Sequence, residues 1–389
     1  MSAPIRAKPA DFDKKIGLVL QGGGALGSYQ AGVYEALAEA GYHPDWVAGI
    51  SIGAINGAII AGNAPAERVA RLRGFWERVT APVTSFPFLP FSQAMNRRWH
   101  ATSALLFGQS GFFAPRPLTD WFSSPVSYYD TAALRSTLEA FIDFDRLNAR
   151  ETRFSVGAAN VRTGDFAYFD SREMRIGPEH IMASAALPPG FPPVEIEGEH
   201  YWDGGLVSNT PLQYVLDYVP RRSRLTFQVD VFNAEGRLPD DLDSAMEREK
   251  DIRYSSRTRA ATDMARVIHD VRHNINSLIE RLPEDLRRTK EAQFLYEFGC
   301  VTRMDIVRLS YRPVEAQGPS KDYEFSAGTM EARWAQGMQD AQSALSGSPW
   351  LEPMPEELGA RLFDGAWATN APAQTSLLAR SRPAAAEAG

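Results

Sequence analysis

The stretch from residue 16 to residue 62 constrains the fold more than any other part of the chain. An apolar run of strand length, Ile16 to Gln21, leads into three consecutive glycines, and helical spacing follows from Tyr29 to Ala40. A second apolar run, Trp46 to Ile50, leads into Ser51 and another helical segment. Because each strand is followed by a helix, this order predicts parallel strands with right-handed crossovers and helices on both faces of a sheet.

Ser51 stands at the centre of a G-x-S-x-G motif, with Gly49 and Gly53 two residues away on either side. Small residues at these positions let the chain turn sharply from strand to helix and expose the serine hydroxyl. The positive N-terminal end of the following helix then faces any anion that forms at the serine. The motif and its setting therefore predict that Ser51 is the nucleophile of an acyl transfer.

Acyl transfer also needs hydrogen-bond donors for the oxyanion of the tetrahedral intermediate. The loop from Gly22 to Gly27 opens a helix, and residues without side chains let backbone N–H groups approach such an anion closely. We expect the amides of Gly23 and Gly24, and next that of Ala25, to form this oxyanion hole.

The base that would take the proton from the serine is harder to predict. None of the six histidines occupies a C-terminal loop after a strand-end acid, as the Ser…Asp…His order of the α/β-hydrolases requires. Asp203, Gly204 and Gly205 follow an apolar Tyr-Trp pair, and the glycines would let this loop fold against the serine turn. A carboxylate in an apolar pocket has a raised pKa and can act as a base without an imidazole. The same three residues also fit an ordinary turn.

Composition excludes several classes of protein. A net charge of −7 and a pI near 5.5 argue against a nucleic-acid partner, because no overall positive field would attract phosphates. The single cysteine, Cys300, excludes an intramolecular disulfide framework and a cysteine-based zinc cluster, which fits a cytoplasmic location. The uncharged span between Asp45 and Glu67 is diluted by glycines and split at Ser51, so it predicts a buried strand and helix and not a membrane span.

The chain divides into regions of different character. Residues 1–15 are predicted to be a flexible arm, and 16–235 carry the α/β pattern. Residues 80–130, rich in proline and aromatic residues without a clean period, fit either a lid or apolar wall beside the site, or a loop-rich part of the core. Residues 236–350 predict a helical extension packed on the core, and 351–389 a tail that is disordered from about residue 371.

One long helix is predicted within residues 240–300, with a mildly basic polar face. Its apolar residues keep helical spacing: Met264, Val267, Ile268, Val271, Ile275, Leu278, Ile279 and Leu282. One interpretation is a helix that faces a membrane surface or a partner. We favour the other interpretation, a helix packed on the core with a solvated outer face. His269 and His273, one turn apart, are expected on its polar flank.

Three motifs in a fixed order resemble the patatin-like phospholipase family. They are QGGGALG (Gln21 to Gly27), GISIG (Gly49 to Gly53) and DGG (Asp203 to Gly205). The proline-rich ASAALPPGFPPV (Ala183 to Val194) is also similar to the family pattern, and the resemblance covers roughly residues 14 to 235.

This resemblance implies a three-layer α/β/α fold with a mainly parallel central sheet. It implies a catalytic dyad of Ser51 and Asp203, an oxyanion hole in the glycine loop, and hydrolysis of acyl ester bonds in lipids without a metal or cofactor. Gln21 stands where many members have aspartate, which we expect to matter little. Ala25 and Leu26 stand where many members have a basic residue, so a contact to substrate phosphate is not implied.

Two other functions fit parts of the sequence. Gly22-x-Gly24-x-x-Gly27 matches the dinucleotide-binding fingerprint of an NAD-dependent oxidoreductase, but the next strand has Asp45 at its start and not at its end. A patatin-fold protein without strong activity could dock to membranes or granules through residues 80–130 and the basic helix. The expected partner is a lipid or other acyl ester, with peripheral membrane contact left open; the sequence gives no prediction of oligomeric state.

Overall fold

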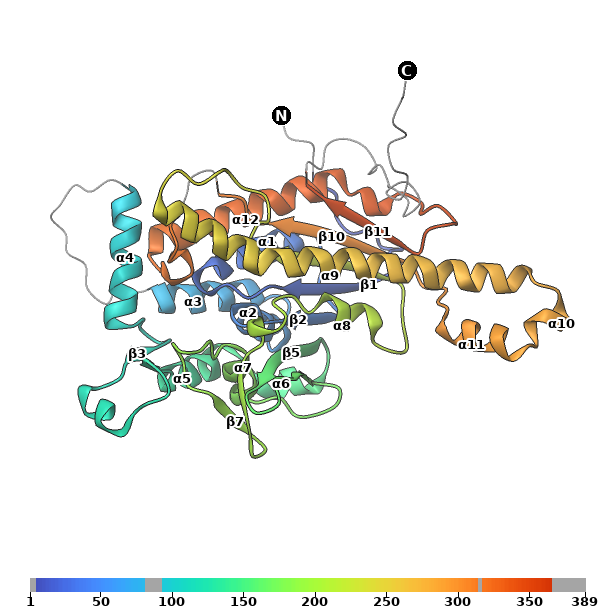
Figure 1. Ribbon diagram of the computed structural model, residues 1–389. Helices are drawn as coiled ribbons and strands as arrows, with labels where there is room; N and C mark the ends of the chain where they lie inside the picture. Colours follow the sequence, from blue (N-terminus) through green and yellow to red (C-terminus); the bar gives the residue numbers. More distant parts are fainter. Residues whose placement is uncertain (1–4, 81–92, 314–316, 366–389) are drawn as a thin grey trace, which may run out of the picture.

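One mixed sheet of nine strands organises the computed structural model, which describes residues 5–80, 93–313 and 317–365 (Figure 1). Six neighbouring strands, from β11 to β5, run parallel; β6 and β8 each pair antiparallel with β5, and β7 pairs antiparallel with β8. The predicted, mainly parallel sheet is therefore confirmed. The order is β11 (Ala360–Asp364), β10 (Met304–Ser310), β9 (Arg224–Asp230), β1 (Lys15–Leu20), β2 (Trp46–Gly49), β5 (Arg153–Asn160), β8 (Glu199–Asp203) and β7 (Val194–Ile196), with β6 (Phe166–Asp170) paired to β5.

Helices cover both faces of this sheet, as the three-layer prediction requires. Successive strand residues point to opposite faces. Leu18 and Leu20 accordingly pack into the larger core, whereas Val19 packs into a second, smaller core on the other face. The larger core includes α1 (Gly27–Glu39), α2 (Ile52–Ala61), α3 (Arg68–Thr80), α5 (Ala132–Phe141), α7 (Pro178–Ser184) and α12 (Ala327–Gly347), and the smaller core includes α8 (Leu212–Asp217) and α9 (Leu242–Arg281).

The C-terminal part of the chain shares the sheet and the core of the N-terminal part. Strands β10 and β11 continue the sheet beyond β9. Helix α12 packs so closely on α1 that a Cβ on Gly32 would lie 1.9 Å from the carbonyl oxygen of Trp334. The far end of α9, with α10 (Glu284–Arg287) and α11 (Lys290–Phe298), projects from the body (Figure 1).

The face of α9 that packs on the sheet differs in part from the face that its apolar spacing predicted. Met264, Val271 and Leu278 are exposed whereas Ile279 is buried, so the predicted stripe coincides only in part with the buried face. The buried face is partly polar because it meets polar groups of neighbouring strands and loops. The Thr262 hydroxyl donates to Gln228 Oε1 at 3.1 Å, and His269 Nε2 hydrogen-bonds to the carbonyl oxygen of Thr302, so His269 is not on a solvated flank.

The proline- and aromatic-rich region, residues 80–130, contains a helix that the sequence pattern did not predict. Of residues 80–130, 81–92 lie outside the described residues, as does the tail predicted to be disordered from about residue 371. Helix α4 (Gln93–Phe107) is followed by the short strands β3 (Ala114–Pro115) and β4 (Tyr129–Asp130), which pair with each other.

Two further predictions from the sequence concern the N-terminal part of the chain. The uncharged span after Asp45 forms β2 and α2, and within the described residues no helix combines the length and apolarity that crossing a bilayer requires. Residues 5–15, expected to be an arm, contact the body: the Lys8 N–H donates to the Ala40 carbonyl oxygen at 2.8 Å, and Phe12 packs edge-on against Tyr42.

Candidate active site

Ser51 occupies a sharp turn between β2 and α2, as the motif predicted. Its φ of 55° and ψ of −125° lie outside the regions that L-residues usually adopt. The turn leaves no space for side chains beside it: a Cβ on Gly49 would lie 2.2 Å from the carbonyl oxygen of Gly53, and one on Gly53 would lie 2.3 Å from that of Leu20. The serine is thus held, half-buried, at the N-terminus of α2 in a locally strained backbone conformation.

A residue that sequence reasoning missed, Ser184, holds this turn. The Ser51 N–H donates to Ser184 Oγ at 3.0 Å, and Ser184 Oγ donates to the carbonyl oxygen of Gly157 at 2.7 Å. Ser184 lies at the end of α7, inside the proline-rich motif that resembles the family pattern. That motif was the available signal, although it did not single out the serine.

The glycine loop lies beside Ser51 and is fixed by side chains from distant segments. Asn209 Nδ2 donates to the carbonyl oxygen of Gly22 at 3.0 Å. Gly24 has a φ of +56°, which favours glycine, and a Cβ there would lie 2.3 Å from the carbonyl oxygen of Asp322. Gly22, Gly23 and Gly24 line the same pocket as Ser51, whereas Ala25 is buried outside the lining.

Gln21 matters more than the sequence suggested, because its side chain joins three segments. Oε1 accepts hydrogen bonds from the backbone N–H groups of Val231 at 2.7 Å and Phe232 at 3.0 Å. Nε2 donates to Thr258 Oγ1 at 3.1 Å and to the carbonyl oxygen of Tyr254 at 3.4 Å. The start of the glycine loop is thereby tied to the end of β9 and to α9.

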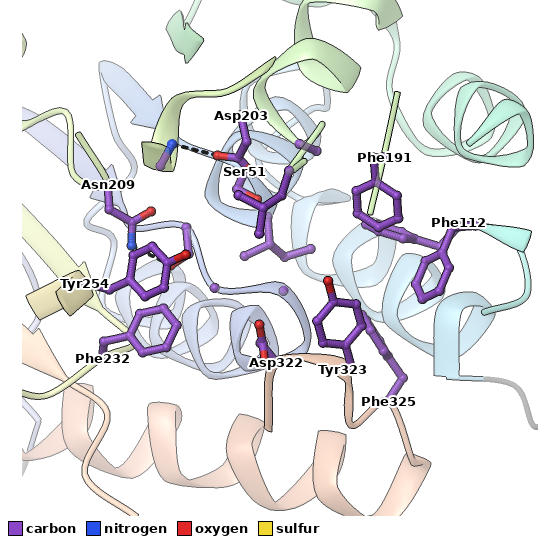
Figure 2. A pocket seen from close by; sticks show the side chains of 18 residues that line it. Ser51, Phe112, Phe191, Asp203, Asn209, Phe232, Tyr254, Asp322, Tyr323 and Phe325 are labelled. Atoms are coloured by element: carbon purple, nitrogen blue, oxygen red, sulfur yellow. Dashed lines mark hydrogen bonds between the residues drawn. The ribbon is translucent and has the colours of Figure 1, made fainter. Parts of the chain in front are cut away.

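Asp203 ends β8 and meets Ser51, although about 150 residues separate them in the chain (Figure 2). The N–H of Gly205 donates to Asp203 Oδ1 at 2.7 Å, and the Ser51 side chain lies close enough to the Asp203 carboxylate to lower its pKa. Burial is the larger effect and raises the pKa of Asp203 to about 7, against the lowering effects of Ser51 and of the Gly205 N–H. A buried carboxylate with this pKa is suited to accept a proton near neutral pH.

The pocket around these groups is mostly aromatic on one side of Ser51 (Figure 2). Its volume is about 60 Å³, less than half of the ~150 Å³ cavity that holds one benzene ring in another protein. A fatty acyl chain is larger than this volume, so it would have to extend beyond the pocket or displace part of the aromatic wall. The lining residues that were not predicted as site residues are Ile52, Phe112, Phe113, Ala185, Leu187, Phe191, Asn209, Phe232, Tyr254, Asp322, Tyr323 and Phe325.

The structure also separates groups that the alternative functions would need together. Among the described lining residues there is no histidine, and Gly27, Gly49, Gly53 and Gly204 shape the turns without lining the pocket. Asp45 accepts from the N–H of Ile16 at the beginning of β1, the opposite end of that strand from the glycine loop. An acid that holds a ribose would have to follow the second strand, whereas Asp45 precedes it. The dinucleotide interpretation therefore lacks the acidic residue that it requires.

Two family models match this chain. The family model of patatin-like phospholipases matches residues 18–216, just over half of the chain, and a model described as patatin phospholipase matches residues 252–357. The chain belongs to the patatin-like phospholipase family.

Individual relatives are much longer than this chain. It is 26% identical over 237 residues to the lysophospholipase NTE1 of Candida glabrata, covering 58% of this chain and 11% of that protein. It is 26% identical over 235 residues to the lysophospholipase NTE1 of Saccharomyces cerevisiae, with the same two shares. The crystal structure of VipD from Legionella pneumophila aligns with a TM-score of 0.38 and 14% identity, over 89% of this chain and 70% of that chain.

Proposed function

We propose that this protein is a serine acyl hydrolase that cleaves carboxylic ester bonds of lipids, of the phospholipase A, lysophospholipase or lipid esterase type. The observation that carries the proposal is the placement of Ser51 beside a desolvated Asp203 carboxylate in one pocket, next to a loop of glycine amides at a helix N-terminus. Nucleophile, base and oxyanion donors are thus within one pocket, as acyl transfer requires.

In the proposed reaction, Asp203 takes the proton from the Ser51 hydroxyl while the oxygen attacks the ester carbonyl carbon. The amides of Gly23 and Gly24, with Ala25 next, hold the oxyanion, and the positive end of α2 favours the negative charge. The alcohol leaves with the proton from Asp203, and an acyl-enzyme remains on Ser51. Asp203 then takes a proton from water, which attacks the acyl carbon; as the bond from the acyl carbon to Ser51 Oγ breaks, Asp203 returns the proton to Ser51 and the fatty acid leaves.

A fluorophosphonate labelling experiment tests this proposal directly. We expect a tagged alkyl fluorophosphonate to label the protein at a single residue, Ser51, because only an activated serine beside oxyanion donors reacts readily with it. Mass spectrometric mapping of the label is the measurement. The same preparation is then assayed on lysophospholipids, phospholipids, acylglycerols and p-nitrophenyl esters. Absence of both labelling and hydrolysis would instead favour a patatin-fold protein that binds membranes or granules without catalysis.

A group of exposed apolar side chains supports peripheral contact with a lipid surface. We call Leu106, Phe107, Leu118, Phe122 and Val126 the exposed apolar group; Leu118 is exposed by 85% and Phe122 by 93%. In the sequence they flank Phe112 and Phe113 of the pocket wall. Exposed apolar side chains of this kind fit a surface that contacts lipid.

Replacing Leu118 and Phe122 together by serine is expected to weaken binding to phosphatidylcholine vesicles about tenfold, because two large apolar side chains no longer leave water. Sedimentation with sucrose-loaded vesicles measures this. The matched control is Leu278→Ser with Phe294→Ser, an equally apolar pair, exposed by 63% and 70%, at the projecting end of α9 and α11 (Figure 1). A larger loss in the control pair would place the lipid contact at that end instead.

A further inference from the structure

One wall of the pocket comes from the C-terminal part of the chain and carries a carboxylate. The loop 317–325 before α12 contributes Asp322, Tyr323 and Phe325 to the lining. It passes so close to the glycine loop that the Asp322 carbonyl oxygen would lie 2.3 Å from a Cβ on Gly24. A side chain outside the segment matched at residues 18–216 therefore faces the proposed oxyanion donors.

Buried ion pairs hold this loop in place. The Lys321 ammonium, which is buried, lies 3.1 Å from Glu247 and 2.6 Å from Asp251, both on α9. Arg333 of α12 donates to the backbone carbonyl oxygen of Lys321 at 3.0 Å. Breaking such a buried cluster would leave charges without partners, so the loop keeps Asp322 in a fixed position.

The charge of the pocket is one-sided. Asp203 and Asp322 are the charged side chains among its described lining residues, which include no lysine, arginine or histidine. Lys250 pairs with Asp322 at 2.6 Å but lies outside the lining. Burial, and then both carboxylates, raise the pKa values of Tyr254 and Tyr323, so the two carboxylates act on the same small volume. An anion bound there would meet a negative potential in a low-dielectric site.

The two sides of the pocket suit different parts of an ester. Phe112, Phe191 and Phe325 lie on one side of Ser51, and Asn209, Tyr254 and Phe232 lie on the other, with Asp322 between the two groups (Figure 2). The apolar side suits an acyl chain, which leaves the more polar side for the alcohol part of the substrate.

We propose that Asp322 selects substrates by the charge of their alcohol part: esters with a neutral or cationic alcohol react in preference to those with an anionic group beside the scissile bond. This inference rests on the proposed hydrolase function and narrows its substrate class. Like charges brought together in a desolvated site discriminate strongly between ligands.

Three aryl esters with one acyl chain test it: a p-nitrophenyl ester, its analogue with a carboxylate on the ring, and its analogue with a trimethylammonium group. The readout is kcat/KM for each charged ester divided by that for the neutral ester, because comparing this ratio between variants cancels intrinsic reactivity. We expect Asp322→Asn to raise the anionic ratio about tenfold and to lower the cationic ratio. Lys250→Met, which removes the partner of Asp322, is expected to shift both ratios in the opposite direction.

The matched control is Asp145→Asn on α6 (Phe144–Ala149), an exposed carboxylate whose loss changes the net charge equally. Its ratios should equal those of the wild type. The inference is overturned if Asp322→Asn shifts the ratios no more than Asp145→Asn does. Where thermal melting shows Asp322→Asn to be unfolded, Lys250→Met decides: unchanged ratios overturn the inference. A wild-type protein that cleaves none of these esters and no lipid overturns the proposed function itself.

Discussion

Replacing Ser51 by alanine is expected to lower kcat/KM for p-nitrophenyl ester hydrolysis at least about 1,000-fold, because no other group in the pocket can form the acyl-enzyme. Asp203→Asn is expected to lower it at least about 100-fold, since an amide cannot take the serine proton. The asparagine oxygen can still accept the hydrogen bond from Gly205, so the turn is retained. Steady-state kinetics, with thermal melting to verify folding, measure both effects.

The control for this pair is the double replacement of His269 and His273 by glutamine. Their Nε2 atoms hydrogen-bond to the carbonyl oxygens of Thr302 and Glu356, and neither histidine lines the pocket. Turnover by the folded double variant should equal that of the wild type. A collapse of turnover there, or near-full activity in Asp203→Asn, would contradict the Ser51–Asp203 dyad and favour a histidine-dependent triad.

Activity is expected to fall about tenfold for each pH unit below about 7, because Asp203 must be ionised to act as the base and burial raises its pKa to about 7. Between pH 5 and pH 8 the change in kcat/KM would approach 100-fold. Burial raises the pKa values of the neighbouring Tyr254 and Tyr323 above that of free tyrosine, so both phenols stay neutral across this range. A pH–rate profile with a soluble ester measures the limb, and a flat profile from pH 5 to 8 would contradict the assignment.

The stability of the fold should respond to pH in the opposite sense. Asp203 and Asp230 both have a folded-state pKa of about 7, raised by burial above the ordinary aspartate value of 3.8. The folded protein therefore binds more protons than the unfolded chain between these values. Their contribution to the free energy of unfolding is full below about pH 3.8 and is lost as the pH rises through about 7. Melting curves of Asp203→Asn should show a weaker dependence over this interval.

The parts of the site that the sequence predicted are those whose backbone geometry is local. Gly49 and Gly53 are dictated by contacts within a few residues of Ser51 or with the adjacent strand, so the motif alone predicts the turn. The parallel strands were predictable for a similar reason, because an apolar run followed by a helix repeats along the chain. Asp203 needed the family resemblance, because Asp-Gly-Gly is also a common turn.

The rest of the pocket could not be read from local patterns, because it depends on contacts between distant segments. Tyr254 reaches the pocket from the partly polar face of α9, which apolar spacing did not identify. Asp322 and Phe325 come from a loop whose position is fixed by ion pairs to α9. Helix α4 was missed because its polar residues gather in the first half and a continuous apolar run, Ala104 to Phe107, ends it, so no clear helical period stands out.

The side chain of Gln21 connects two parts of this chain that recombination would separate. The Gln21 side-chain amide hydrogen-bonds to Val231, just after β9, and to Thr258 of α9. It therefore connects the loop proposed to stabilise the oxyanion to the helix that holds the charged pocket wall. Recombination near residue 235 would exchange Tyr254 and Thr258 without exchanging Gln21, and would have to restore these hydrogen bonds. The two parts are thus expected to be inherited together, as a single unit of selection.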